Sequence, residues 1–203
     1  LQKEEIVAQS EKLKKSYNDL ENLTNIGKLI TANLYIEKIN DIAYEPINKL
    51  MDAMAFGIGV YDESKNAITF PGVMEKGKKI GTLTYPLEEE QRLAVLCYTR
   101  GTEIFINDLE NEYSQFFQEL LPPKTDNDSK SIIYLPLVSE NRTLGVITVQ
   151  SFKRNAYTLY HLNILRNLAV YAKIAIENAS AYGKINQQKE NLKIARDNIN
   201  NQK

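Results

Sequence analysis

Cys97 is the side chain best suited to nucleophilic chemistry, and it is the one cysteine among 203 residues. A reactive thiol needs a neighbouring base or cation that lowers its pKa. The chain has a single histidine, His161, and nothing in the sequence pairs it with Cys97. Cys97 falls on the apolar side of a predicted helix, so the sequence favours a buried structural or pocket-lining thiol over a nucleophile.

His161 belongs to the first turn of a predicted long helix, because Thr158 has the side chain of a helix N-cap. The phosphoacceptor histidine of histidine kinases is followed by an acidic residue, whereas Leu162 follows here, and we interpret His161 as structural. One histidine and one cysteine cannot build a zinc site. Without a paired acid and base or an activated nucleophile, we predict no catalytic residue, no metal site and no enzymatic activity in this chain.

Gly72–Lys78 matches the phosphate-loop pattern G-x-x-x-x-G-K, but Lys79 stands where that loop needs a Ser or Thr hydroxyl to hold magnesium. A strand-like run at 80–83 follows in place of a helix, so we predict an ordinary hairpin loop. Three carboxylates, Glu88–Glu90, are expected to complement the N-terminus of a helix over 88–100.

The elements that position these residues are best defined between 131 and 179. Residues 132–137 and 144–149 are rich in β-branched side chains, and the polar Ser139–Arg142 joins them, which predicts a strand hairpin. Beyond Thr158 the apolar residues recur with helical spacing, as Leu162, Leu165, Leu168, Ala169, Ala172, Ala175, Ile176 and Ala179 show.

Residues 35–107 are predicted to contain both strands and helices. We predict strands over 56–62, 67–70 and 103–107. A helix over 35–55 is expected to kink or to restart at Pro46, because proline lacks a backbone donor.

Both ends of the chain read as charged helices with narrow apolar seams. The seam residues are Ile6, Leu13, Leu20, Leu23, Ile30 and Leu34 in the first helix, and Ile185, Leu192, Ala195 and Ile199 in the second. A monomer buries so narrow a stripe poorly, which favours a dimeric coiled coil, with a solvated surface helix as the alternative. Because the chain begins at Leu1 inside a helical pattern and ends inside another, we expect it to be a piece of a longer protein.

Several strings carry a resemblance to a known family. They are Ile-Tyr-Leu-Pro-Leu at 133–137, Leu-Gly-Val-Ile-Thr-Val-Gln-Ser at 144–151, Asn-Ala-Tyr-Thr at 155–158 and Ala-Ile-Glu-Asn-Ala at 175–179. Together they resemble the C-terminal half of a GAF domain, a small ligand-sensing module of signalling proteins. The strand-like runs at 56–62 and 103–108 resemble two further parts of that family.

The resemblance implies an α+β fold, a GAF-like central antiparallel sheet with helices on both faces, flanked by long N- and C-terminal coiled-coil helices. We divide the chain into an N-terminal signalling helix (1–34), a GAF domain (35–181) and a C-terminal linker helix (182–203). The first and the long helix are expected to share one sheet face, with a pocket on the other.

The resemblance also places a ligand pocket between the sheet and residues 88–121. The candidate pocket residues are Tyr61, Arg92, Cys97, Tyr98, Asp108, Tyr113 and Tyr134. Core aromatic residues with satisfied hydroxyl groups are the alternative. The positions that match the cyclic-nucleotide-binding signature hold Gln150-Ser151, Tyr157 and His161-Leu162, and only the aromatic residue is kept.

Composition narrows the function further. Hydrophobic residues make up 43% of the chain and the net charge is −1, which indicates a globular protein without attraction to nucleic acid. No apolar run is long enough to insert into a membrane, and the single cysteine fits a cytoplasmic protein.

We therefore expect a non-catalytic sensory domain of a bacterial signalling protein, with a sensor histidine kinase of a two-component system as the favoured parent. It would bind an unknown small molecule without an identifiable cofactor, form a homodimer through the flanking helices, and act on a covalently attached effector domain. The alternatives are a ligand-free structural dimerisation module and the regulatory domain of a nucleotide cyclase or a serine phosphatase.

Overall fold

The computed structural model describes residues 2–119, 121–124, 128–140 and 142–200, with side chains from 3 to 197 within those ranges. Leu1, the Ile199 side chain and residues 201–203, which belong to the predicted terminal helices, lie outside the described residues. So does Asn141 of the predicted hairpin loop.

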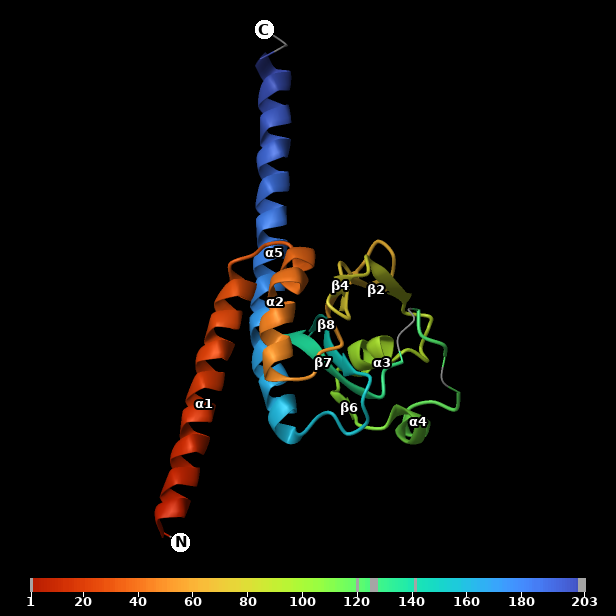
Figure 1. Cartoon of the computed structure of the whole chain (residues 1–203). Coiled ribbons are helices and arrows are strands. Elements are labelled where there is room, and N and C mark those ends of the chain that lie inside the picture. Colours follow the sequence, from red (N-terminus) through yellow and green to blue (C-terminus); the bar gives the residue numbers. More distant parts are fainter. Residues whose placement is uncertain (1, 120, 125–127, 141, 201–203) are drawn as a thin grey trace.

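Helices lie on both sides of one sheet (Figure 1). The helices are α1 (Gln2–Thr31), α2 (Ile36–Leu50), α3 (Leu93–Arg100), α4 (Leu109–Glu112) and α5 (Leu159–Asn200), with a 3₁₀ turn η1 (Tyr113–Gln115) after α4. The helices α1, α2 and α5 form one layer, which we call the helical layer, and α3 and α4 lie on the other side of the sheet.

The sheet is antiparallel throughout the described residues. Its strands are β1 (Ala55–Asp62), β2 (Ala67–Phe70), β3 (Met74–Glu75), β4 (Lys78–Lys79), β5 (Leu83–Pro86), β6 (Ile104–Ile106), β7 (Ser131–Ser139) and β8 (Arg142–Ser151). The strands follow the order β4-β3-β1-β8-β7-β6, and β2 pairs with both β1 and β5. The predicted α+β fold with helices on both faces is confirmed.

The outer edge of β1 is shared by two strands and is interrupted between them. β2 pairs with Val60–Asp62 and β3 pairs with Ala55 and Phe56, which leaves Ile58 opposite neither strand. The Ile58 backbone N–H donates instead to Asn40 Oδ1 of α2 at 3.0 Å. A buried N–H needs a partner, and here a helix side chain supplies it.

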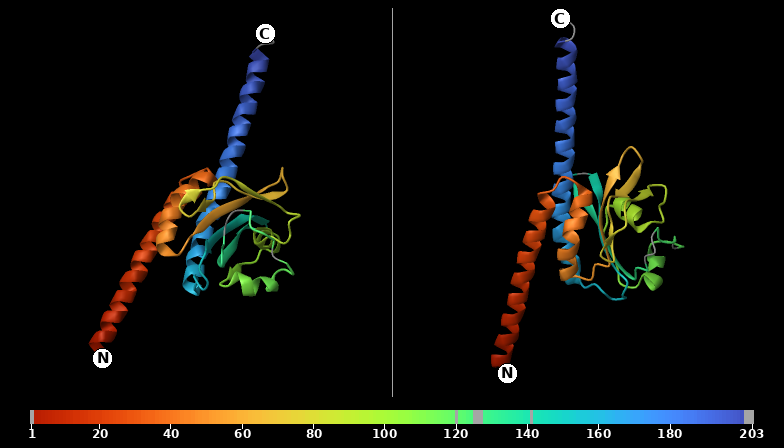
Figure 2. Two further views of the ribbon diagram at one scale, coloured as in Figure 1. Left: turned by 45° about the vertical axis from the view of Figure 1, so that its right-hand side comes forward. Right: turned by 45° about the horizontal axis from the view of Figure 1, so that its top comes forward.

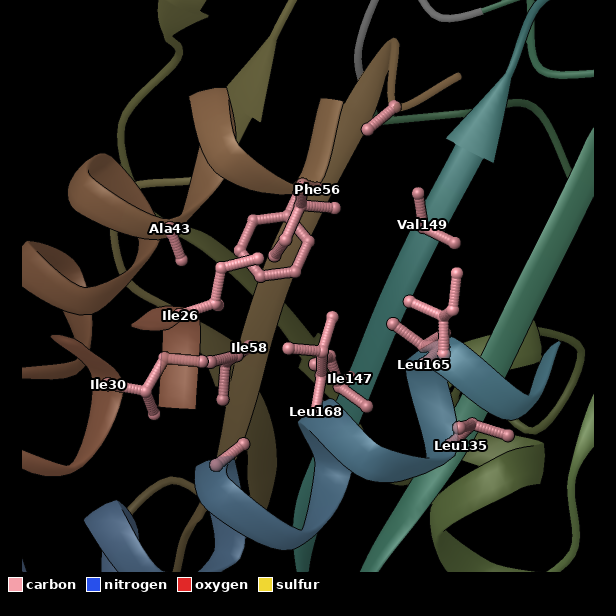
Figure 3. Close-up of a cluster of buried hydrophobic side chains, with 14 of the residues drawn as sticks. Ile26, Ile30, Ala43, Phe56, Ile58, Leu135, Ile147, Val149, Leu165 and Leu168 are labelled. Carbon is pink, nitrogen blue, oxygen red and sulfur yellow. The ribbon is translucent and has the colours of Figure 1, made fainter. Parts of the chain in front are cut away.

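Two apolar clusters occupy the two faces of the sheet. The larger lies under the helical layer, where Ile26 and Ile30 of α1, Ala43 of α2 and Leu165 and Leu168 of α5 converge on β1 and β8 (Figure 3). The smaller lies under α3. Six members of the predicted stripe, Leu162, Leu165, Leu168, Ala172, Ala175 and Ile176, form the buried face of α5, whereas Ala169 and Ala179 are only partly buried.

α1 and α5 run parallel to each other and project from opposite ends of the domain (Figures 1 and 2). Tyr160 Oη donates to Asp19 Oδ2, and two to three turns further along both helices Tyr171 contacts Gly27. Upstream of this contact Ile6, Leu13 and Leu20 are 63–72% exposed, whereas Leu23 and Ile30 are buried within the chain. The predicted seam of the first helix thus divides into an internal half and an exposed half.

The first turn of α5 begins after Thr158, as the sequence predicts, but the capping bond is made by His161. The Thr158 backbone N–H donates to His161 Nδ1 at 3.1 Å, and Thr158 O accepts the Leu162 N–H at 3.1 Å. The bond to His161 corresponds to one half of a capping box, with an imidazole in place of Glu or Gln. Burial, with a smaller contribution from Lys15, lowers the pKa of His161, which keeps the ring in the form that accepts the bond.

Four sequence expectations need correction. The helix predicted over 35–55 does not restart at Pro46, because α2 continues through it to Leu50 while Tyr44 and Ile47 stay packed in the core. The helix expected from residue 88 begins at Leu93. The edge strand expected at 80–83 is replaced by β4 and β5 on either side.

The helix predicted over 1–34 ends at Thr31. The resemblance of Gly72–Lys78 to a phosphate loop has no structural counterpart, since this segment forms the β3–β4 hairpin. Lys76 and Gly77 at its tip have φ values of 51° and 73°, the positive values that a tight two-residue hairpin turn requires.

Candidate ligand cavity

A cavity of about 250 Å³ lies on the sheet face opposite the helical layer. Strands β1, β7 and β8 form its floor, α3 covers it, and the segment from Phe70 to Tyr85 forms one wall. Most of the lining is apolar, and it includes Phe70, Val73, Ile80, Leu83, Leu93, Ala94, Leu109 and Ile132.

A group of hydrogen-bonded polar side chains occupies the floor. Gln150 Nε2 donates to Tyr134 Oη at 3.2 Å, and Ser129 Oγ donates to Gln150 Oε1 at 2.7 Å. Thr148, on the same face of β8 as Gln150, lies 3.4 Å from Gln150 Nε2. Burial raises the pKa of Tyr134, so its phenol is neutral and suited to hydrogen bonding. This floor can recognise hydrogen-bonding groups on a ligand that enters an otherwise apolar space.

Two cations share one carboxylate at the rim. Arg92 Nε lies 2.9 Å from Glu89 Oε2, and Lys124 Nζ lies 2.9 Å from Glu89 Oε1. Burial would raise the pKa of Glu89, but hydrogen bonds from Lys124 and Arg92 outweigh it and hold this pKa below its usual value. Both cations also make cation–π contacts with the Tyr85 ring, with Lys124 Nζ 4.8 Å and Arg92 Cζ 5.8 Å from its centroid.

Backbone carbonyl groups fix the positions of these cations. Arg92 Nη1 donates to Pro122 O at 2.5 Å, and Lys124 Nζ donates to Thr84 O at 2.7 Å. The sequence led us to expect that Glu88–Glu90 complement a helix N-terminus. Glu89 does not do so. Its carboxylate joins α3's N-cap residue to a loop more than thirty residues away.

Two of the seven predicted pocket residues, Arg92 and Tyr134, line this cavity. Tyr61 and Tyr98 stack on each other outside it, with ring centroids 5.2 Å apart, and Tyr61 Oη donates to Asn66 Oδ1 at 3.1 Å. Cys97 is buried in the core under α3, where burial raises the pKa of its thiol.

Asp108 and Tyr113 also lie away from the cavity lining. Asp108 is the N-cap residue of α4, and its Oδ2 accepts a hydrogen bond from Asn111 Nδ2 at 2.8 Å. Tyr113 begins η1, and its carbonyl oxygen accepts the Phe116 and Phe117 N–H groups. Both residues thus shape the α4–η1 segment, of which Leu109 alone reaches the cavity.

Sequence reasoning missed most of the polar lining residues, among them Glu75, Lys124, Ser129, Thr148 and Gln150. Thr148 and Gln150 alternate with apolar residues along a predicted strand, so they share one face, and this signal could have identified them. Glu75 is 7% exposed on β3 and lies in the wall of the cavity. Lys124 comes from a loop whose position depends on contacts distant in the sequence, and no local pattern marks it.

The residues matching the cyclic-nucleotide signature bind other partners. Ser151 Oγ donates to Asp52 Oδ2 at 2.8 Å, while His161 caps α5. Tyr157 Oη donates to Asp52 O at 2.7 Å, and burial raises its pKa. These contacts join the loop before α5 to the loop before β1.

The described residues form neither a metal-ligand cluster nor a membrane-spanning helix. Within that part of the chain, no group of three or more His, Cys, Asp or Glu side chains is arranged to hold a metal ion. In the same residues no helix combines the length and apolar character needed to cross a membrane.

Comparison with known proteins gives a family match and several relatives. The family profile described as GAF domain matches residues 35–177. The formate hydrogenlyase transcriptional activator FhlA of Escherichia coli strain K12 is 32% identical over 106 residues, which are 52% of this chain and 15% of that protein. This chain therefore corresponds to a small part of the relative's length.

Solved structures share the fold at low sequence identity. The GAF domain of an Acinetobacter phosphoenolpyruvate-protein phosphotransferase has a TM-score of 0.66 and 19% identity, covering 80% of this chain and 94% of that one. The free methionine-R-sulfoxide reductase of Neisseria meningitidis, in complex with its substrate, has a TM-score of 0.63 and 15% identity, covering 83% and 93%.

Proposed function

Because the chain belongs to the GAF domain family, we propose that it is a sensory domain that binds a small molecule in the cavity beneath α3. The observation that carries this proposal is the cavity itself, an apolar space with a hydrogen-bonding floor and a cationic rim. Its volume of about 250 Å³ is below the range of about 300–1,000 Å³ that is common for drug-sized ligands. The ligand we propose is therefore compact.

The proposed output runs through the helical layer. α1 and α5 lie on the sheet face away from the cavity and project from opposite ends of the domain. We propose that ligand binding shifts how the sheet seats these helices by an ångström or two, and that the shift reaches an effector domain attached beyond them. Homodimerisation is part of this proposal, because Leu13 and Leu20 of α1 and Leu192 of α5 leave 63–72% of their surface exposed.

For the parent protein we propose two classes, a sensor histidine kinase and a transcription regulator. The sequence pattern of the two terminal helices favours a sensor histidine kinase. The curated relative is a transcriptional activator, which favours a transcription regulator instead. In either case the domain would be regulatory and cytoplasmic.

We also propose that this chain binds without turning over a substrate. Its one thiol, Cys97, is buried with a raised pKa, so it is a poor nucleophile. The fold is shared with a methionine sulfoxide reductase, and turnover of free methionine sulfoxide by the purified chain would overturn this part of the proposal.

A thermal-shift screen with a metabolite library tests the binding function. A ligand present at about 100 times its Kd stabilises a protein by about 2.7 kcal/mol. A compound of the proposed kind raises the Tm of the unchanged protein and of Tyr61→Phe, whose ring lies outside the cavity, but not that of Gln150→Leu. Native mass spectrometry then gives the stoichiometry.

A structural dimerisation module without a ligand is the second candidate. The observation in its favour is that Ser129, Gln150 and Tyr134 already bond to one another, so the floor is satisfied without a ligand. A library that leaves the Tm unchanged, together with a stable dimer, would favour this candidate.

A further inference from the structure

Residues 70–80 form one wall of the cavity, and the other side of this segment contacts α2. Phe70, Val73, Glu75 and Ile80 of this segment line the cavity. The residues between and beside them contact α2 instead. One short segment, including the β3–β4 hairpin, therefore contacts both the cavity and α2.

Asn40 makes the most buried of the contacts between this segment and α2. Its side chain has no exposed surface, and its Nδ2 donates to Pro71 O at 2.8 Å. Its Oδ1 accepts the Ile58 N–H at 3.0 Å, in the gap between β2 and β3. A single amide thus joins α2, the middle of β1 and the turn that begins the cavity wall.

Two further contacts join α2 to the hairpin. Tyr44 Oη accepts the Gly77 N–H at 3.0 Å. Lys79 Nζ lies 2.5 Å from Glu37 Oε1 and 3.0 Å from Asp41 Oδ2. With Asn40, these side chains cover about two turns of one face of α2.

The turn at Gly72 also lies directly on α2. A β-carbon built on Gly72 would stand 2.7 Å from Glu37 Cγ and 2.8 Å from Lys79 Cε. The turn therefore lies close to the Glu37 side chain of α2, and glycine is the residue that leaves space for it.

The opposite face of α2 packs into the helical layer. Ile39, Ala43 and Ile47 belong to the same buried cluster as Ile26 and Ile30 of α1. Figure 3 shows Ala43 of α2 beside Ile26 of α1 and above β1. A displacement of α2 would therefore be felt by α1, which in turn contacts α5 at Tyr171.

We propose that α2 is the element that responds to the cavity: residues 70–80, held to α2 by Asn40, Tyr44 and Lys79, couple the filling of the cavity to the helical layer. This inference rests on the proposed sensory function and names its route. The coupling uses the edge of the sheet, and the contact of α5 with the sheet floor is secondary to it.

Hydrogen exchange of the full chain, measured peptide by peptide with mass spectrometry, tests this route without a ligand. Ala94→Leu adds volume to the cavity from α3 and serves as the probe, and Ala94→Val is the smaller substitute if Ala94→Leu does not fold. We expect the added side chain to change exchange rates in residues 70–80 and in α2 by at least about threefold.

The double variant Tyr44→Phe/Lys79→Met removes two of the three contacts while keeping the apolar parts of both side chains. In that background the probe still changes exchange in residues 70–80, but the change in α2 falls to less than about half. Arg166→Met is the matched control, because it breaks a comparable surface ion pair, that of α5 with Glu103, and leaves the α2 response intact.

Two results would overturn the route. One is an α2 response of equal size with and without the Tyr44 and Lys79 contacts. The other is a cavity probe that leaves residues 70–80 unchanged. A ligand screen without a hit would instead remove the sensory function and leave the exchange result standing, so the two failures can be told apart.

Discussion

The ring of Tyr171 on α5 lies directly over Gly27 on α1. A β-carbon built on Gly27 would stand 2.5 Å from the nearest ring atom, inside the distance at which real β-carbons are found. Since glycine is a poor helix former, its presence in the interior of α1 costs about 1 kcal/mol relative to alanine. The close approach of the two helices explains why this position is occupied by glycine.

Gly27→Ala should therefore destabilise the protein despite its better helix propensity. Overpacking of a fitted contact costs about 1–3 kcal/mol, and the middle of this range, about 2 kcal/mol, exceeds the gain of about 1 kcal/mol in helix propensity. Urea unfolding measures the change. In a Tyr171→Ala background the same substitution should be neutral or stabilising, and a loss of equal size in both backgrounds would show that the ring is not the cause.

His161→Ala should remove the cap of α5 and lower the free energy of unfolding by about 1 kcal/mol. His161→Gln is the control, because glutamine in this position can accept the same Thr158 N–H bond. Thermal unfolding of the three proteins at pH 7.5 compares them. Equal loss in both variants would indicate that packing, and not the cap, matters here.

The same histidine should make stability depend on pH. Its folded pKa lies below the ordinary value of 6.5, so the unfolded chain binds the extra proton more readily. Its contribution is complete above about pH 6.5 and is lost as the pH falls from there through the lowered pKa. Denaturation curves between pH 5 and 8 should show this slope in the unchanged protein and a smaller one in His161→Gln.

Glu89→Gln should weaken the rim of the cavity. The pKa of this carboxyl group is depressed, so its contribution is present above the unfolded pKa and disappears as the pH falls through the lower folded value. Because the pair is partly exposed, we expect a loss of about 0.5–1 kcal/mol at pH 7. The difference from the unchanged protein should vanish in acid, and a constant difference at all pH values would contradict the charge explanation.

Leu13→Glu together with Leu20→Glu should weaken the proposed dimer at least about tenfold, because both side chains lie on the exposed half of the α1 seam. Val138→Glu is the control, since Val138 is an exposed apolar residue on β7, away from α1. Sedimentation equilibrium of the three proteins gives the association constants. An unchanged protein that stays monomeric at high concentration would end the dimer proposal.

The sequence predicted an element correctly where the spacing of apolar residues repeats over many consecutive positions. The stripe from Leu162 to Ile176 and the two β-branched runs of β7 and β8 each repeat one period over many residues, and the structure has them as predicted. The predicted start of α3 at residue 88 was wrong, because three consecutive glutamates resemble a helix N-terminus. Glu89 is instead held by Arg92 and by Lys124, a partner that no local pattern could reveal.

The cavity was harder to predict than the fold for a related reason. Cys97 and Tyr98 do lie on the predicted short helix, but only its first residues, Leu93 and Ala94, face the cavity. Which turn of a helix meets a cavity depends on how the helix is tilted over the sheet. That tilt is set by packing among segments far apart in the chain, and it cannot be predicted from the spacing of apolar residues.

The length of α5 has a mechanical consequence. It runs without a break from the sheet to Asn200, and its described side chains from Ser180 to Asp197 are all exposed. A helical segment of about 20 residues is about 30 Å long at 1.5 Å per residue. A continuous rod of this length turns together with the part of α5 that is seated on β7 and β8. A tilt of only about 2° at the seat would carry the far tip sideways by about 1 Å, so a small change of angle in the domain reaches the distant end.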